Sequence, residues 1–277
     1  MSGTLYVVAS PLGNLADVTP RAAETLCAVG LVAAEDTRRT RKLLHHIGAR
    51  PRIMSLPAFA EVERSGAVVS ELELGTDVAL VTDAGTPGVS DPGAALVSQV
   101  RRQGFRVVPI PGPSAVAVAL SASGFPADSY LFLGFPPRKG KARRDLLELA
   151  ATARWTMVFF ESPNRLGTLL ADLGDVLGGA RPAVVARELT KVHEEVRSGT
   201  LADLAEHFGA TAVRGEVTLV VAGRAGDAPR PDPEAVSASA AQLIAEGLST
   251  REIVGRLTEQ WGLSRNEGYR LVTRLSP

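Results

Sequence analysis

The stretch Val78-Ala-Leu-Val-Thr-Asp-Ala-Gly-Thr-Pro-Gly88 is an apolar, strand-like run that breaks into a loop rich in Gly, Pro and Asp. The same arrangement occurs twice more, where Tyr6–Ala9 leads into Ser10–Asn14 and Val107–Ile110 leads into Pro111–Ala115. In open α/β sheets, ligands bind beyond the carboxyl ends of the strands, where glycines let the backbone approach closely. The three loops therefore predict one shared ligand crevice.

Strand-like and helical runs alternate along the rest of the chain, which predicts an α/β fold with crossover helices. Thr19 and Pro20 mark the first helix as its N-cap and first residue, and we expect it to end at Gly30. Within that helix, Cys27 is expected to be a small buried hydrophobe. The expected strands are Leu31–Ala34, Val78–Val81, Phe105–Ile110, Thr156–Phe160, Ala183–Ala186 and Val217–Ala222.

The domain organisation follows from composition shifts. Small residues over Ser114–Ser121 indicate a tightly packed helix, so we place the boundary between two α/β domains here, at 1–113 and 114–224. A proline-rich run predicts a linker over 225–235. In the remaining 236–277, Ser249–Glu252 and Ser264–Glu267 match the capping-box pattern and predict a small helical domain. Its arginines alternate with glutamates, which favours a helical cap over a nucleic-acid reader.

Composition and missing motifs exclude several classes of protein. Thirty basic and thirty acidic residues cancel, so a polyanionic partner would need a local basic patch. A single cysteine and the lack of a long apolar run predict a cytoplasmic protein without a membrane span. No dinucleotide fingerprint, phosphate loop or nucleophile elbow is present. The four histidines lack metal-ligand spacing, so we expect no metal.

Charged side chains follow four of the predicted strands, as Glu35–Arg38, Asp83, Glu161–Arg165 and Arg187–Lys191. Each alone is as well explained by a helix cap or a surface ion pair. Together, at the carboxyl ends of strands, they favour a functional rim.

Two basic clusters flank this rim. Each alone is compatible with a solvated helix face. Clustered charge in a neutral chain, beside a Gly/Pro loop that carries Phe135, better fits an RNA backbone with a stacked base. The predicted RNA-binding residues are Arg38, Arg39, Arg41 and Lys42 of the first basic cluster and Arg138, Lys139, Lys141, Arg143 and Arg144 of the second.

Several strings between residue 3 and about 222 resemble one known family. They include Asp83–Gly93, Pro109–Ala115, Glu161–Arg165 and Ala186–Lys191, and the most specific parts are Asp83–Pro87 and Arg187–Lys191. They are similar to the tetrapyrrole-methylase-like, class III S-adenosylmethionine-dependent methyltransferases that act on small-subunit ribosomal RNA.

The resemblance implies two α/β domains with the methyl donor in the cleft between them, a homodimer, and 2'-O-methylation of a decoding-centre cytidine in 16S ribosomal RNA. Two departures from the family pattern, at Ala58–Arg64 and at Asn164, mean that no essential base is expected there. The predicted donor-binding residues are Pro11, Asp83, Gly85, Thr86, Pro87, Gly88, Val89, Ser114 and Ala115.

Methyl transfer to a ribose hydroxyl is an in-line displacement that needs alignment and an activated nucleophile. Lys191 and Arg187 are candidates to stabilise the developing alkoxide, and Asp36 or Glu188 to accept the proton. We prefer Lys191 with Glu188.

Two alternatives stay open. One is a methylase of a porphyrinoid carbon, which would need fewer cations than the two clusters supply. The other is a ribosome-assembly factor that binds RNA without catalysis, which would not need the Asp83–Gly93 loop.

Overall fold

A computed structural model describes residues 2–210, 214–224, 233–261, 263 and 265–275. The chain divides into two compact units, residues 1–224 and 225–277. Of the predicted linker, residues 225–232 lie outside the described part, as does Ser264 of the second capping box. Within the described residues, no helix is long and apolar enough to span a bilayer.

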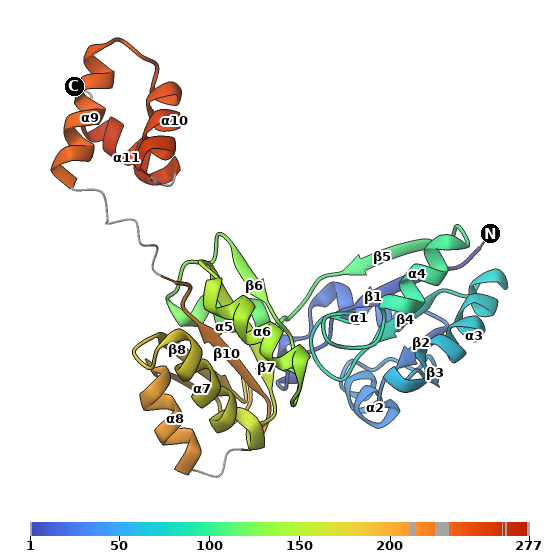
Figure 1. Ribbon diagram of the computed structural model, residues 1–277. Helices are drawn as coiled ribbons and strands as arrows, with labels where there is room; N and C mark the ends of the chain where they lie inside the picture. The colour runs from blue at the N-terminus through green and yellow to red at the C-terminus, as the bar shows by residue number, and fades with distance from the viewer. Residues whose placement is uncertain (1, 211–213, 225–232, 262, 264, 276–277) are drawn as a thin grey trace. The chain divides into compact units, whose positions relative to one another are not determined.

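The first half of the larger unit is a parallel sheet in the order β3-β2-β4-β1-β5 (Figure 1). The register pairs Leu5 of β1 with Val78 of β4 and Val107 of β5. Because all strands run the same way, their carboxyl ends meet at one edge. The strands are β1 (Thr4–Val8), β2 (Leu31–Ala34), β3 (Arg52–Ser55), β4 (Val78–Val81) and β5 (Arg106–Ile110).

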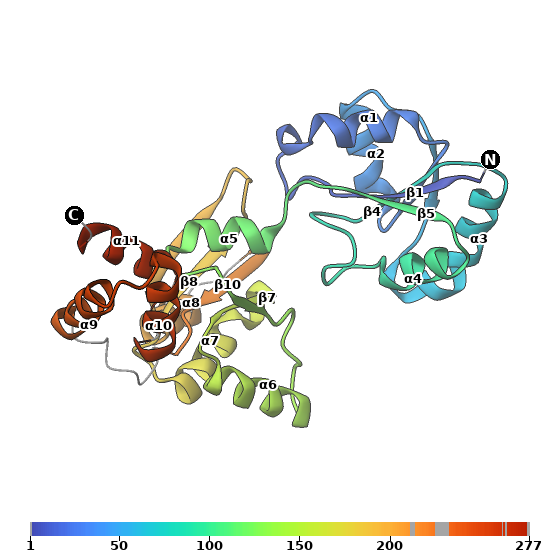
Figure 2. The ribbon, with the colours of Figure 1, turned by 90° about the horizontal axis from the view of Figure 1, so that it is seen from above.

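Helices cover both faces of this sheet, with α1 and α2 on one side and α3 and α4 on the other (Figure 2). Thr19 caps α1 by accepting a hydrogen bond from the Ala22 N–H, as predicted. The expectation for Cys27 is wrong: it is exposed, because it lies outside the Ala22 and Leu26 face that packs on the sheet. The helices are α1 (Pro20–Ala28), α2 (Thr37–His46), α3 (Glu61–Glu73) and α4 (Ala94–Arg102), with short 3₁₀ turns η1 (Leu15–Asp17) and η2 (Ala58–Ala60).

The second half is a mixed sheet in the order β6-β7-β10-β8-β9. Strand β10 runs antiparallel to β7 and β8, so its first residue, Val217, pairs with their last residues, Glu161 and Arg187. The start of β10 therefore lies at the edge where β7 and β8 end. The strands are β6 (Tyr130–Phe132), β7 (Thr156–Glu161), β8 (Pro182–Arg187), β9 (Glu195–Thr200) and β10 (Val217–Val221).

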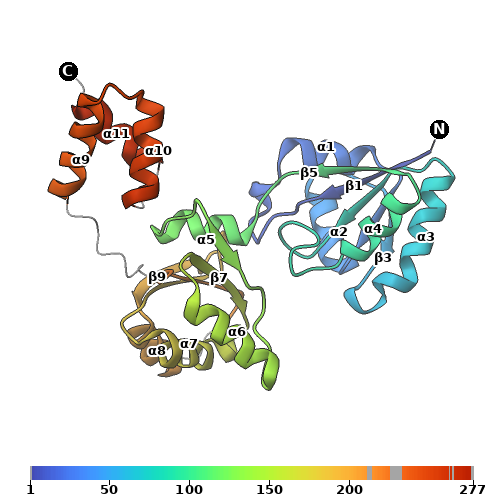
Figure 3. The ribbon, with the colours of Figure 1, turned by 45° about the horizontal axis from the view of Figure 1, so that its top comes forward.

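Helices α6 (Lys141–Thr152), α7 (Pro163–Leu177) and α8 (Leu201–Ala210) cover one face of the second sheet, and α5 (Ala115–Ser123) lies on the other (Figure 3). The boundary predicted at 113/114 falls between β5 and α5. The two sheets with their covering helices confirm the α/β class.

The smaller unit consists of α9 (Pro233–Ala245), α10 (Thr250–Trp261) and α11 (Arg265–Leu275) around an apolar core. Ser249 and Glu252 form the predicted capping box at the start of α10, since each binds the other's backbone N–H. The linker prediction extended through residue 235, but residues 233–235 form the first turn of α9. Proline suits the first position of a helix, where its missing N–H costs nothing.

Candidate active site

A cavity of about 440 Å³ lies where the carboxyl ends of the first sheet face the second sheet. The three loops predicted from the sequence supply Leu12, Gly85, Thr86, Ser114 and Ala115 to its wall. An adjoining cavity of about 320 Å³ shares Leu12, Arg39 and Asp83 with the first and is also lined by Pro11, Lys42 and Lys191.

Two backbone hydrogen bonds and one from a side chain hold the three loops together. Ser10 and Gly85 each donate an N–H to the other's carbonyl, at 2.8 and 3.0 Å. Thr86 Oγ1 donates to the Pro113 carbonyl at 3.3 Å. Gly85 has φ +75°, a conformation that favours glycine. Of the predicted donor residues, Asp83 and Val89 also line the larger cavity, whereas Pro87 and Gly88 line neither.

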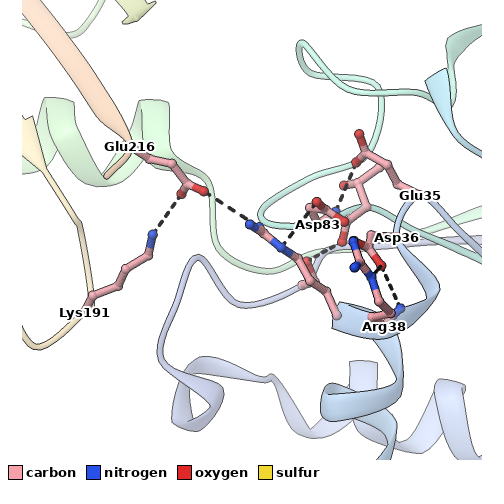
Figure 4. A network of polar contacts seen from close by, with 9 residues as sticks. Glu35, Asp36, Arg38, Asp83, Lys191 and Glu216 are labelled. Atoms are coloured by element: carbon pink, nitrogen blue, oxygen red, sulfur yellow. Dashed lines mark hydrogen bonds and ion pairs between the residues drawn. The ribbon is translucent and has the colours of Figure 1, made fainter. Parts of the chain in front are cut away.

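A chain of charged groups crosses between the two sheets beside these cavities (Figure 4). Arg39 of α2 lies 3.5 Å from Asp83 and 3.9 Å from Glu216, which precedes β10. Lys191 Nζ lies 3.2 Å from the other oxygen of Glu216. Glu35 accepts the Asp83 N–H at 3.2 Å. Arg39 and Glu216 thus connect the two halves of the larger unit at the edge of the site.

Lys191 and Glu188 form a close pair at 2.9 Å, after the end of β8. Burial opposes ionisation of both groups. The contact with Glu188 nevertheless raises the pKa of Lys191, and the contact with Lys191 lowers the pKa of Glu188. Both are therefore charged at neutral pH. Glu188 and Thr190 have φ of +51° and +67°, which is strain of the kind that functional sites retain.

Two glycines make room for this pair. A Cβ at Gly13 would lie 2.4 Å from Lys191 Cγ, and a Cβ at Gly215 would lie 2.1 Å from Glu188 Oε1. The side chains of Lys191 and Glu188 therefore lie directly on glycine backbone.

Asp36 and Arg187, also predicted as catalytic, line neither cavity. Asp36 caps α2, and hydrogen bonds from Arg38 lower its pKa to about 2. Arg187 pairs with Glu195 at 2.9 Å and donates to the Arg214 carbonyl at 3.2 Å. Local partners thus occupy both side chains.

The structure places two acidic residues in the larger cavity that sequence reasoning missed, Asp91 and Glu216. Asp91 follows the Gly88–Ser90 segment, and burial, followed by the negative charge of Glu35, raises its pKa to about 6. Burial also raises the pKa of Glu35, which lines the same wall. Asp91 belongs to the family-specific string Asp83–Gly93, but it does not directly follow a strand, which was the signal used to select charged residues.

Asp91→Asn should stabilise the substrate-free protein at neutral pH. The folded-state pKa of about 6 lies above the ordinary value of 3.8, so Asp91 favours the folded state while protonated and loses that contribution as pH rises through this range. The difference between these two pKa values corresponds to roughly 3 kcal/mol, which partial exposure reduces to about 1 kcal/mol. Urea unfolding at pH 4 and pH 7.5 measures the free energy of unfolding of both proteins. If the stability gained by the variant over wild type does not grow with pH, the prediction is contradicted.

The predicted RNA-binding residues fall into different environments. Arg38 pairs with Asp36, Arg39 belongs to the chain of charged groups, and Lys42 lines the smaller cavity. Arg143 binds Asp172 and donates to the Pro137 carbonyl at 2.9 Å, so it holds a loop and is not available to RNA. The exposed remainder comprises Arg41, Arg138, Lys139, Lys141 and Arg144.

Among the described residues, no group of three or more His, Cys, Asp or Glu side chains is arranged to hold a metal ion. The two cavities are lined by carboxylates and by Lys191, which pairs with Glu188 and Glu216.

Residues 4–205 match the tetrapyrrole (corrin/porphyrin) methylases, and the chain belongs to this family. It is 42% identical to the ribosomal RNA small subunit methyltransferase I of Haemophilus influenzae, over 97% of this chain and 96% of that protein. The proteins of the same name from Vibrio cholerae and Mycobacterium bovis are 44% and 46% identical, over 96% and 91% of this chain and 93% and 87% of theirs.

Solved structures share the fold at lower identity. The methyltransferase CobJ superposes with a TM-score of 0.63 at 20% identity, over 81% of this chain and 95% of CobJ. Uroporphyrin-III C-methyltransferase from Thermus thermophilus, solved with S-adenyl homocysteine, gives 0.59 at 20% identity, over 79% of this chain and 97% of that chain.

Proposed function

We propose that this protein transfers a methyl group from S-adenosylmethionine to the 2'-hydroxyl of a cytidine in the decoding centre of 16S ribosomal RNA. The observation that carries the proposal is the cavity of about 440 Å³ built from three glycine-containing loops. The names of the relatives, which are 42–46% identical to this chain, supply the substrate class.

The larger cavity suits the methyl donor in size and charge. Its volume lies within the range of about 300–1,000 Å³ that is common for small-molecule sites. S-Adenosylmethionine carries a sulfonium and an ammonium group, and Glu35, Asp83, Asp91 and Glu216 place carboxylates in the wall. The backbone around Gly85 allows close approach of the neutral parts of the donor.

In the reaction, the 2'-oxygen attacks the methyl carbon as the carbon–sulfur bond breaks, and the hydroxyl proton leaves. Lys191 stabilises the developing alkoxide from the adjoining cavity. Glu188 holds Lys191 in place and keeps it charged. Asp91 suits the role of proton acceptor better than Asp36 or Glu188, because of these three only its pKa is raised towards neutrality.

Two measurements test this proposal. Calorimetric titration with S-adenosylmethionine separates a catalyst from a protein that only binds RNA. Mass mapping of small-subunit RNA from a strain without the gene should show one cytidine that lacks its 2'-O-methyl group, and complementation should restore it. We also propose that the protein is a cytoplasmic homodimer. Light scattering of the purified protein should then give twice the mass of one chain.

Neutralising the second basic cluster should flatten the salt dependence of RNA binding. When Arg138, Lys139, Lys141 and Arg144 are changed together to Gln, we expect the slope of log K against log salt to fall by about 0.7–0.9 for each phosphate that is no longer neutralised. Arg143 is left intact because it holds the loop. Changing Arg101, Arg102 and Arg106, which lie around the start of β5, is the matched control. If both variants give equal slopes of log K against log salt, the four cations are ordinary solvent-exposed side chains that do not contact RNA.

A further inference from the structure

We propose that the ring of Phe135 is a binding surface for a nucleobase, on which the base of the methylated nucleotide stacks. This inference rests on the proposed function and names the part of the RNA that enters the cavity.

Phe135 is an exposed aromatic residue in the wall of the larger cavity. Its exposed fraction is 56%, although it lines the cavity together with Gly85 and Ser114. The ring packs on Phe160 with centroids 5.5 Å apart and an interplanar angle of 58°, and Phe160 in turn contacts Phe132 at 5.0 Å. Aromatic rings therefore support Phe135 on one side while much of its surface is open.

The loop that carries Phe135 is fixed by hydrogen bonds on both sides of the ring. The Gly134 carbonyl accepts from Phe160 N at 2.9 Å, and the Pro136 carbonyl accepts from Arg165 at 2.6 Å. Arg143, held by Asp172, donates to the Pro137 carbonyl. Arg165 also pairs with the buried Glu161 at 2.9 Å. A rigid loop thus holds an apolar ring in contact with solvent, which folding alone does not require.

The surroundings of the ring match the chemistry of single-stranded RNA. Proteins that bind such strands combine aromatic side chains that stack bases with cations that follow the phosphates. Four exposed cations, Arg138, Lys139, Lys141 and Arg144, follow Phe135 within ten residues. The phosphates on either side of a base stacked on Phe135 would therefore lie near these four cations.

The reaction also needs such a surface. A ribose in stacked RNA cannot bring its 2'-hydroxyl to a methyl group inside a cavity, whereas a base splayed onto an aromatic ring carries its ribose with it. Phe135 belongs to the same wall as the donor loops, and the segment that carries it approaches them: a Cβ at Gly134 would lie 3.3 Å from Ser90 Oγ. A base on Phe135 would place its sugar towards the donor.

The test uses small subunits from a strain that lacks the gene, and measures single-turnover methylation against subunit concentration. Phe135→Ala should raise the concentration for half-maximal rate by about 10–100-fold, the range expected for loss of one aromatic–base stack. Phe135→Leu keeps an apolar contact with Phe160 but has no ring face, so it should behave like alanine. Phe135→Tyr should stay within about threefold of wild type. Tyr130→Ala, which removes an exposed ring at the far end of β6, is the matched control and should have no effect.

Calorimetry with S-adenosylmethionine separates the two possible bases. If Phe135→Ala weakens donor binding tenfold or more, the ring stacks the donor's adenine and the proposal is overturned. Equal half-maximal concentrations for Phe135→Ala, Phe135→Leu and wild type would also overturn it. Failure of the wild-type protein to methylate the subunits would instead contradict the proposed function itself.

Discussion

Lys191→Met should slow methyl transfer by about 10²–10³, the range typical for removing one electrostatic stabiliser of a transition state. Lys191 Nζ lies 2.9 Å from Glu188 and 3.2 Å from Glu216, so its charge is held in place before substrate arrives. Methionine keeps the length and the apolar stem that lies against Gly13 but removes the charge. The measurement is single-turnover methylation at saturating RNA and donor, which isolates the chemical step.

Affinities for donor and RNA should change much less than the rate in this variant, because the lysine acts on charge that develops only during the reaction. Lys191→Arg keeps a cation on the same backbone and should recover part of the rate. A Lys191→Met rate within threefold of wild type would remove this residue from the chemistry and direct attention to Asp91.

Gly85→Val should abolish measurable donor binding, with a fall in affinity of about 100-fold or more. A Cβ at this position would meet Leu12 at 3.4 Å, which is ordinary contact, so the main cost is the backbone. At φ +75° a branched side chain is strained by about 1–3 kcal/mol, and relief of that strain would break the paired hydrogen bonds with Ser10. The two loops would then separate at the cavity wall.

Gly104→Val is the matched control for this strain. Gly104 has φ +80°, a Cβ added to it would have no neighbouring atom within 4 Å, and it lies outside the cavity. Both variants should lose stability, but only Gly85→Val should lose the donor in calorimetry. Normal donor affinity in Gly85→Val would exclude this loop from the donor site.

The fold was predictable where strands are buried on both faces. Strands β2 and β4 coincide with the predicted ranges, because every residue in them is apolar and buried. Strands β3, β6 and β9 were not predicted. All three form edges of their sheets, and β9 has the largely polar sequence Glu-Val-Arg-Ser-Gly-Thr, which carries no continuous apolar signal. Edge strands tolerate such sequences because one side pairs with nothing.

The site was predictable in part for a related reason. A search for charged residues at the carboxyl ends of strands finds Asp83, Glu188 and Lys191, but it misses Glu216, which precedes β10. Because β10 is antiparallel to its neighbours, its amino end lies at the functional edge. Strand direction in a mixed sheet depends on pairing between distant segments, which local sequence patterns do not report.

The packing of Lys191 and Glu188 on Gly13 and Gly215 has a consequence for mutational scanning of this protein. Alanine substitution ordinarily removes side-chain atoms, and its effect measures the function of those atoms. At Gly13 and Gly215, alanine instead adds a methyl group, which would displace the side chain of Lys191 or Glu188 from the glycine backbone. Activity would then fall when a glycine, which has no functional group, is replaced. Each loss would reflect the displacement of Lys191 or Glu188. Part of this active site therefore depends on two positions that carry no side chain of their own, where Lys191 and Glu188 fill the space.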